Sequence, residues 1–319
     1  MMHGGDARYL KKINTNRLLN QIRLLDPADA PALSELTGFQ PSTITNLLRE
    51  LKQWNLIRLQ GRGASTRLGG KPPQLWELNP NYGFFLGLWI LPGTLCRLVL
   101  TNFKREILFQ EEYVLKSTEL PDNVQVREWI EAVLNRHSVD AESLLGLGIA
   151  LPTDIYQKKA YLYVKELNNG FSCPIQLTTP SRAGAMALKW FYRPAMDCAN
   201  IAYFTIEPGG TGICLMGSQI INHHLVEGAS GLAGMHEIPL LRPGTELLSF
   251  EKAVSSLACW LDPGFVGWSD LTAENLEEQR AVEIEVNPAR TMMVKMNPLK
   301  QNTMPLGAIA MHYCRFFMA

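Results

Sequence analysis

The hydrophobic pattern at the start of the chain has the period of an amphipathic helix. From Asn14 to Leu25 one apolar stripe recurs every three or four residues, and Asp26-Pro27 ends it. Leu33 and Leu36 predict a short second helix. Gly38 permits the tight turn behind that helix, because glycine adopts a positive φ without strain. The pattern therefore predicts two successive helices before residue 40.

A third helix is predicted from Pro41, which suits a first helical turn. Its apolar positions repeat at i, i+3, i+4 and i+7 and are expected to face inward: Ile44, Leu47, Leu48 and Leu51. The outer positions are polar: Ser42, Thr43, Thr45, Asn46 and Arg49. In a helix-turn-helix, side chains at the start of the second helix meet base edges, and flanking cations meet phosphates. These five residues are therefore candidate DNA contacts, with a plain helical hairpin as the alternative.

Two strand-like runs, Leu56–Leu59 and Gln74–Leu78, predict a β-hairpin after the helices. The segment between them is rich in glycine, contains no acid and carries Arg62, Arg67 and Lys71. A helix-turn-helix followed by a basic-tipped hairpin is a winged helix, whose arm can enter a narrow minor groove. A disordered basic loop is the alternative interpretation.

The pattern changes after Asn79-Pro80-Asn81, which we interpret as a hinge. Three strand-like runs predict a meander over residues 84–90, 95–101 and 107–115. Helical and strand patterns then alternate, with helices at 124–136 and 183–191, strands at 144–151 and 201–206, and a hairpin of 212–216 with 219–222. This order predicts an α/β domain with a mixed sheet. We therefore expect a winged helix-turn-helix DNA-binding domain at 1–80 and a second domain at 81–319.

Composition adds an asymmetry of charge. The 319-residue chain is 46% hydrophobic and 19% charged, as is ordinary for a globular protein, and its net charge is zero. Residues 1–80, however, hold 11 Lys and Arg against 6 Asp and Glu, while the remainder holds 19 against 24. This favours a polyanionic partner for the front domain, although patches of this size also arise by chance.

Other features of the composition bear on location. The sequence contains no run of 18 apolar residues that would predict a membrane span. The start MMHGGDARYLKK lacks the apolar core of a secretory signal. The six cysteines are scattered without a CxxC pair, which fits a reduced compartment. We expect a cytoplasmic protein that does not enter a membrane.

Three motifs in the second domain follow one another in a recognisable order. They are LGLGIALPTD (Leu145–Asp154), EPGGTGICLMGSQIINHHLVEGASGLAG (Glu207–Gly234) and NPLKQNTMPLGAIAMHY (Asn297–Tyr313). With the winged helix before them, they resemble the ROK family of repressors, open reading frames and kinases. The resemblance implies an actin-like, sugar-kinase-like fold of two α/β lobes around a sugar cleft, shortened here between Trp260 and Pro288.

The resemblance also implies a function and its partners. Repressors of this family bind operator DNA and typically release it when a sugar or sugar phosphate binds, commonly as dimers or tetramers. We therefore expect a homodimeric or homotetrameric repressor of carbohydrate-related genes, with a double-stranded DNA operator as its partner.

Several positions depart from the kinase members of that family. The phosphate loop loses its acid in the stretch Trp89–Thr94, and Arg182 occupies the position of the general base. A guanidinium stays protonated and cannot accept a hydroxyl proton. Met235–Ile238 replaces the family's Glu-x-Gly-His run, and Arg242–Ala253 replaces its zinc-binding cysteine cluster. We therefore expect no kinase activity, no cofactor and no bound metal.

Four residues of the Gly-rich region stay candidates for sugar binding: Gly210, Thr211, His236 and Glu237. A histidine beside a glutamate can contact sugar hydroxyls, and a structural histidine with an ordinary hydrogen bond is the alternative. Three functions stay open. The chain is a sugar-responsive regulator, an effectorless DNA-binding regulator controlled by a protein partner, or a ROK sugar kinase with unusual catalytic groups.

Overall fold

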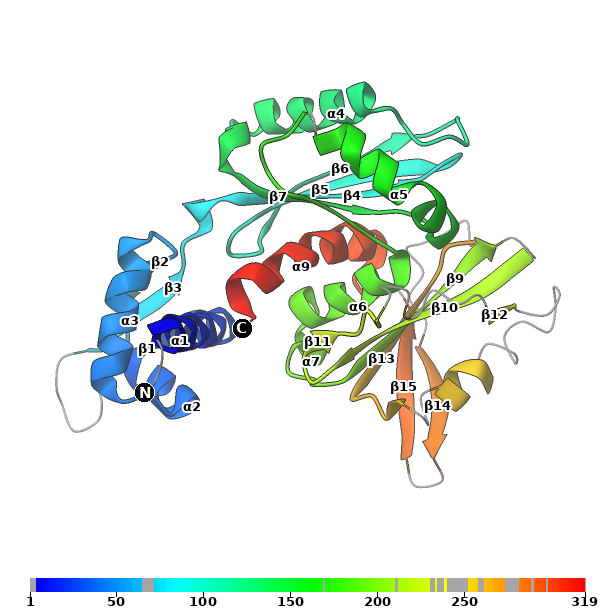
Figure 1. The fold of residues 1–319 in the computed structure, drawn as a ribbon. Coiled ribbons are helices and arrows are strands. Elements are labelled where there is room, and N and C mark those ends of the chain that lie inside the picture. The colour runs from blue at the N-terminus through cyan, green and yellow to red at the C-terminus, as the bar shows by residue number, and fades with distance from the viewer. Residues whose placement is uncertain are drawn as a thin grey trace. The chain divides into compact units, whose positions relative to one another are not determined.

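The computed structural model, drawn in Figure 1, describes most of the chain. The chain forms two compact units. The described residues are 4–64, 72–168, 170–209, 212–229, 233, 238–239, 252–257, 261–272, 281–287, 290–296 and 298–318. Unit 1 consists of Met1–Phe84, Thr101–Leu108 and His312–Ala319, and unit 2 consists of Phe85–Leu100 and Phe109–Met311.

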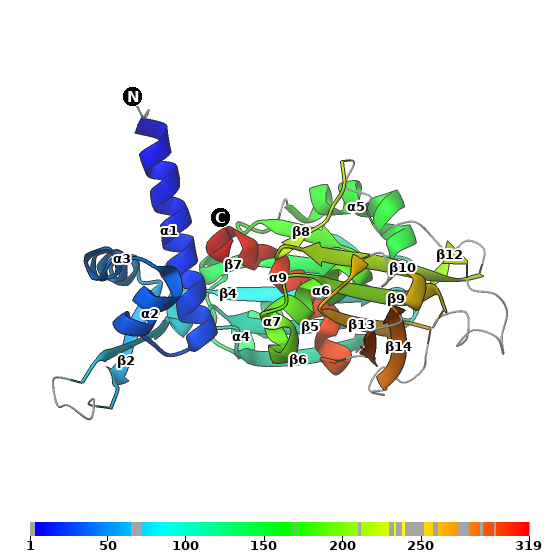
Figure 2. The ribbon, with the colours of Figure 1, turned by 90° about the horizontal axis from the view of Figure 1, so that it is seen from below.

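Unit 1 begins with three helices, α1 (Gly4–Leu25), α2 (Ala30–Thr37) and α3 (Pro41–Gln53). Each helix supplies side chains to one core, including the fully buried Leu18, Leu33 and Ile44. Figure 2 shows α1 from its side, with α2 and α3 beside the part nearer its C-terminal end. The three predicted helices are thus present, but α1 begins ten residues before the predicted Asn14. Between Arg8 and Lys12 the only apolar side chains are the adjacent Tyr9 and Leu10, and both are exposed, so no apolar stripe indicates a helix there.

A small antiparallel sheet of order β1-β3-β2 completes the N-terminal part of unit 1. Its strands are β1 (Ala28–Asp29), β2 (Ile57–Arg62) and β3 (Gln74–Leu78). Two later segments also belong to this unit. Phe103 packs its ring against Tyr82, Phe316 and Phe317, with ring centroids 4.8, 5.3 and 5.5 Å away.

A five-stranded sheet of order β6-β5-β4-β7-β8 belongs mostly to unit 2, and its strands β7 and β8 run parallel. Its strands are β4 (Phe84–Leu91), β5 (Leu95–Asn102), β6 (Ile107–Val114), β7 (Leu144–Ala150) and β8 (Ile175–Thr178). Unit 2 also contains the helices α4 (Asn123–Arg136), α5 (Thr153–Asn168) and, as far as Met311, α9 (Thr303–Phe317). Within unit 2, α9 approaches β4 and β7 so closely that a Cβ on Gly87 would lie 2.1 Å from the Pro305 carbonyl oxygen.

The second sheet of unit 2 has the order β11-β10-β9-β13-β15-β14, and β12 also pairs with β10. Its strands are β9 (Ile201–Gly209), β10 (Gly212–Ile221), β11 (His224–Leu225), β12 (Ile238–Pro239), β13 (Phe265–Asp270), β14 (Ala281–Asn287) and β15 (Arg290–Met296). Helix α6 (Pro180–Phe191) packs on β9, β10 and β13, and the short α7 (Arg193–Met196) follows it. Parallel pairing joins β13 to both β9 and β15, so the mixed sheet that the sequence predicts is confirmed.

The predicted hairpin of residues 212–216 with 219–222 is wrong. Residues 212–221 form the single strand β10, which pairs along its length with β9. Gly217-Ser218 resembles a turn in the sequence, but Gly217 lies opposite Phe204 across the ladder. A Cβ at Gly217 would lie 3.2 Å from the Phe204 ring, so the glycine makes room for an aromatic side chain rather than reversing the chain.

Candidate nucleic-acid interface and sugar cleft

Both ends of α2, including its turn into α3, are fixed by local hydrogen bonds. At its start, Asp29 caps α2 by accepting a hydrogen bond from the Ala32 amide at 2.8 Å. Gly38 ends α2 with φ 70° and donates its amide to the Ser34 carbonyl, while the Ser34 hydroxyl donates to the carbonyl of Phe39 at 2.7 Å. The entry of α3 at Pro41 is therefore set by residues within the turn itself.

Helix α3 separates its apolar and polar residues completely. Ile44 and Leu51 are 0% exposed, and Leu47 and Leu48 are 6% and 5% exposed. The five candidate DNA contacts all lie on the other side of the helix: Ser42, Thr45, Asn46 and Arg49 are exposed, and Thr43 is half-buried. Arg49 donates from Nη2 to the Asn46 side-chain oxygen at 2.8 Å, which orients the Asn46 amide. A short polar face with one cation beside it is therefore presented to solvent.

The hairpin of β2 and β3 brings one further candidate to the surface of unit 1. The strands pair from Ile57 with Leu78 to Arg62 with Gln74, and the Gly63 amide donates to the Pro73 carbonyl at 2.8 Å beyond that pair. The Arg62 side chain is exposed at this end of the ladder. Arg67 and Lys71 lie outside the described residues.

An ion network that sequence reasoning missed lies at the base of this hairpin. The Glu77 carboxylate is 2% exposed and accepts hydrogen bonds from Arg58 Nε at 2.7 Å and Lys104 Nζ at 2.6 Å. Lys104 Nζ also lies 3.2 Å from Asp26 Oδ1. Burial alone would raise the pKa of Glu77, but the two cations outweigh it and hold that pKa below its ordinary value. No local pattern links Glu77 to Lys104, because they are far apart in the sequence.

In unit 2, Arg182 lies in the first turn of α6, directly after β8. Its side chain is 4% exposed, and its Nη2 donates to the Ala233 carbonyl at 3.1 Å. The residue at the expected general-base position is thus a buried cation that holds the backbone of a neighbouring segment. Its chemistry is that of a structural donor, because a guanidinium cannot take a proton.

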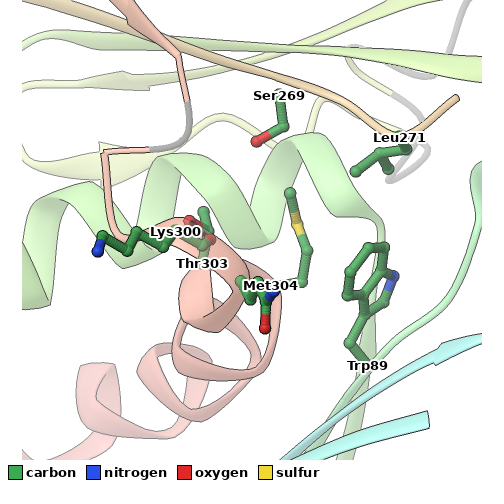
Figure 3. A pocket seen from close by; sticks show the side chains of 7 residues that line it. Trp89, Ser269, Leu271, Lys300, Thr303 and Met304 are labelled. Atoms are coloured by element: carbon green, nitrogen blue, oxygen red, sulfur yellow. Dashed lines mark hydrogen bonds between the residues drawn. The ribbon is translucent and has the colours of Figure 1, made fainter. Parts of the chain in front are cut away.

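Trp89 lies at the end of β4, in the stretch that resembles a phosphate loop, and is 1% exposed. It lines a hollow of about 10 Å³ together with Ser269, Leu271, Lys300, Gln301, Thr303 and Met304. In Figure 3, Trp89 and Leu271 lie on one side of this hollow, with Lys300 and Thr303 on the other. The hollow has room for about one water molecule and is too small for a phosphate group.

A buried carboxyl group at the end of β9 was also missed by sequence reasoning. Glu207 is 2% exposed, and burial raises its pKa. It accepts hydrogen bonds from the Thr153 amide at 3.0 Å and the Thr205 hydroxyl at 2.6 Å. Its contact with Thr153, the first residue of α5, makes it a capping group for that helix.

The remaining candidates of the predicted sugar site lie outside the described residues: Gly210, Thr211, His236 and Glu237. Within the part of the chain that the structure describes, no group of three His, Cys, Asp or Glu residues is placed to hold a metal ion. In the same part, no helix combines the length and apolar character that crossing a membrane requires.

No family model matches the chain. Its sequence is similar to curated repressors, and its structure is similar to solved structures of ROK proteins. It is 27% identical over 243 residues to the xylose repressor of Bacillus spizizenii and 26% identical over 243 residues to that of Bacillus subtilis. Each alignment covers 72% of this chain and 60% of the relative, so the chain spans about 60% of the length of these curated relatives.

Two solved structures share the fold. A ROK family transcriptional regulator, a homolog of the E. coli MLC protein, matches with a TM-score of 0.59 and 15% identity, over 82% of this chain and 83% of that one. The ROK hexokinase from Thermus thermophilus matches with a TM-score of 0.51 and 14% identity, over 71% and 97%. The resemblance to ROK-family regulators that the motifs indicate is therefore confirmed.

Proposed function

We propose that this relative of the xylose repressors, with the fold of a ROK-family regulator, is a sequence-specific DNA-binding repressor of carbohydrate-related genes. The observation that carries the proposal is the outer face of α3. Five polar side chains occupy it, and the four apolar residues of the opposite face are buried in the core. Polar side chains at the start of a second helix are suited to base edges in a major groove.

We further propose that residues 1–80 form a winged helix-turn-helix, with α2 and α3 as its helices and the β2–β3 hairpin as its wing. The order of helices and strands and the three-residue turn support this arrangement. Arg62, Arg67 and Lys71 would then contact phosphates or a minor groove. The excess of basic residues in the first 80 positions favours the same partner.

The remaining expectations complete the proposal. The operator would be a partly palindromic duplex bound by a homodimer or homotetramer in the cytoplasm, with half-sites about one helical turn or a multiple apart. A sugar or sugar phosphate would be the effector, bound near Gly210, Thr211, His236 and Glu237. The replaced Glu-x-Gly-His run favours, as a second candidate, a regulator that has lost its effector and answers to a protein partner.

Phosphoryl transfer is the alternative that the shared hexokinase fold raises. Two observations in unit 2 argue against it. Arg182 is buried in the position expected for the general base, and the hollow beside Trp89 has no room for a phosphate group. A kinase needs both positioning and charge stabilisation of the transferred group, and neither is supplied by these residues.

The proposed function is tested by selecting preferred duplexes from a random library with the purified chain, followed by salt titrations of variants. Asn46→Ala should cost about 1–3 kcal/mol on the selected duplex and much less on random DNA, because it removes a base contact. Arg62→Ala should weaken binding to both duplexes and reduce the salt slope by about one. Lys116→Ala, an exposed change in unit 2, serves as the control. If no duplex is enriched, or if Asn46→Ala weakens both duplexes equally, the proposal is wrong.

A further inference from the structure

A hollow of about 340 Å³ lies within unit 1, where α1, the turn between α3 and β2, and the last turn of α9 meet. It is separate from the exposed face of α3, since none of the five candidate DNA contacts lines it. Leu19 and Leu56 form a buried apolar floor. Trp54 and Phe316 form its aromatic walls, and Trp54 is 49% exposed. The volume falls within the range of small-molecule sites, about 300–1,000 Å³.

The charged residues that line the hollow are all positively charged. Arg8, Lys11, Lys12 and Arg315 line it, and none of the other described residues that line it is acidic. Lys11 is paired with Glu50 at 2.9 Å. Arg8, Lys12 and Arg315 form no salt bridge with any of the residues that the structure describes. Three positive charges therefore surround an apolar space without a counter-charge from the described chain.

Two polar residues that line the hollow, Thr15 and Asn16, already form hydrogen bonds within the protein. The Thr15 hydroxyl donates to the Lys11 carbonyl at 2.8 Å, and the Asn16 amide donates to the Met318 carbonyl at 2.9 Å. Phe316 is held edge-on against Tyr82 and Phe103, with interplanar angles of 83° and 82°. The Phe316 wall is thus held by its neighbours, and the hollow offers an occupant both apolar surface and positive charge.

We propose that this hollow is a ligand site for a small amphipathic organic anion, in which a flat aromatic ring carries a carboxylate. The ring would fill the space between Trp54 and Phe316, where aromatic contact adds to the burial of apolar surface. The carboxylate would pair with Arg8, Lys12 and Arg315 at the rim, since charge-assisted hydrogen bonds to arginine are among the stronger ones.

The shape and chemistry of the hollow favour this class over a nucleic acid. A DNA backbone would satisfy the cations, but its phosphates and sugars are hydrophilic and would leave the apolar floor empty. An uncharged aromatic would fill the floor and leave three cations unpaired. Only a molecule with both parts matches both surfaces. The inference does not depend on the proposed function, because it rests on residues outside the candidate DNA face.

Isothermal titration calorimetry of the full chain with 2-naphthoate, and with the neutral 2-naphthalenemethanol, tests the proposal. We expect one naphthoate per chain and binding of the neutral alcohol at least tenfold weaker. Arg315→Gln and Trp54→Ala should each weaken naphthoate binding at least tenfold. The matched controls are Lys116→Gln and Tyr161→Ala, which change an exposed cation and an exposed aromatic of unit 2 and should leave the dissociation constant unchanged.

Three results of the calorimetry would overturn the proposal: no naphthoate binding at millimolar concentration, equal binding of the neutral alcohol, or full affinity in the folded Arg315→Gln variant. Circular dichroism establishes folding of each variant, and Lys12→Gln takes the place of Trp54→Ala should that change unfold the unit. A competition arm uses random duplex DNA. If equimolar duplex displaces naphthoate, the hollow belongs to the DNA surface and a separate ligand site is excluded. Retained naphthoate binding in the presence of duplex supports the proposal.

Discussion

Helices α3 and α6 begin alike and are used in opposite ways. Each opens with Pro-Ser and runs for 13 or 12 residues. In α3 four apolar residues are buried and the polar side is left to solvent. In α6 every residue from Pro180 to Trp190 is buried, including Arg182 and Lys189. The polar groups of α6 are therefore used in the interior of unit 2, whereas those of α3 are available to another molecule.

The difference shows that residue type alone does not identify a binding surface. Arg182 and Arg49 are both arginines on a helix beside a predicted site, but Arg182 is buried against the backbone of its own unit and Arg49 is exposed. A substitution on α6 should therefore change stability, while one on the outer face of α3 should change recognition and leave stability nearly unaltered. The following variants test this contrast, beginning with the largest effect.

Gly184→Ala on α6 should destabilise unit 2 by about 3 kcal/mol. A Cβ at this position would lie 2.1 Å from the ring of Tyr203, which is fully buried and cannot retreat. On an exposed helix the same change would stabilise, because alanine favours helix more than glycine does. Urea unfolding measures the loss. Gly61→Ala in β2 is the control, since nothing lies within 4 Å of its added Cβ. An unchanged unfolding midpoint for Gly184→Ala would show that α6 is packed loosely.

Lys189→Met should destabilise unit 2 by about 2 kcal/mol, because hydrogen bonds to a buried charged group are lost. Lys189 Nζ donates to the carbonyls of Met196 and Cys198 and lies 2.7 Å from His223 Nδ1. Burial, and then the Lys189 charge, lower the pKa of His223 below its ordinary value. The variant should move that pKa part of the way back up, as followed by NMR titration.

The sign of the pH effect follows from that shift. Because folding favours the neutral form of His223, His223 costs the folded protein stability as the pH falls below the ordinary histidine pKa. In Lys189→Met this dependence should be shallower. Lys165→Met, on the exposed side of α5, should change neither the stability nor the titration of His223. A His223 pKa that stays fixed in Lys189→Met would exclude the Lys189 charge as a cause.

Ser42→Ala on α3 should have the smallest effect, within about 0.5 kcal/mol of the wild-type free energy of unfolding. Ser42 is exposed, and α3 lacks a side-chain hydrogen bond at its N-cap, so no structural bond is broken. Thermal and urea unfolding both measure this change in the free energy of unfolding. A loss above 1 kcal/mol would mean that the outer face of α3 already serves the fold, which would remove the contrast with α6.

The sequence predicts α3 well because one physical signal decides it. Its apolar residues recur with the period of a helix that is half in water, and all four are buried as expected. Helix α6 was expected from Ala183 and begins at Pro180, and its complete burial could not be predicted. Arg182 and Lys189 are seven residues apart and so share one face, which indicates a polar side in water, but packing within unit 2 buries that side as well.

Other elements were missed for different reasons. Helix α5 and the strands β8, β13, β14 and β15 were not anticipated. Ala281–Asn287 of β14 alternates between apolar and polar residue types over one short run, whereas α5 mixes lysines with tyrosines and shows little contrast between its faces. The pairing of Glu77 with Lys104 leaves no trace in either local pattern. Contacts between distant segments are set by the folded arrangement and not by periodicity.

The assembly of unit 1 from separate chain segments has a consequence for how such proteins can evolve by gene fusion. The unit is assembled from three separate stretches of the chain, and the later two supply Phe103, Lys104 and Phe317. Lys104 neutralises Glu77, and the Arg23 guanidinium lies 6.0 Å from the Phe317 ring centroid. A gene fusion that exchanged only the first 84 codons would separate these partners. Recombination could therefore give this protein a new front unit only if matching changes arrived at two distant places in the same gene.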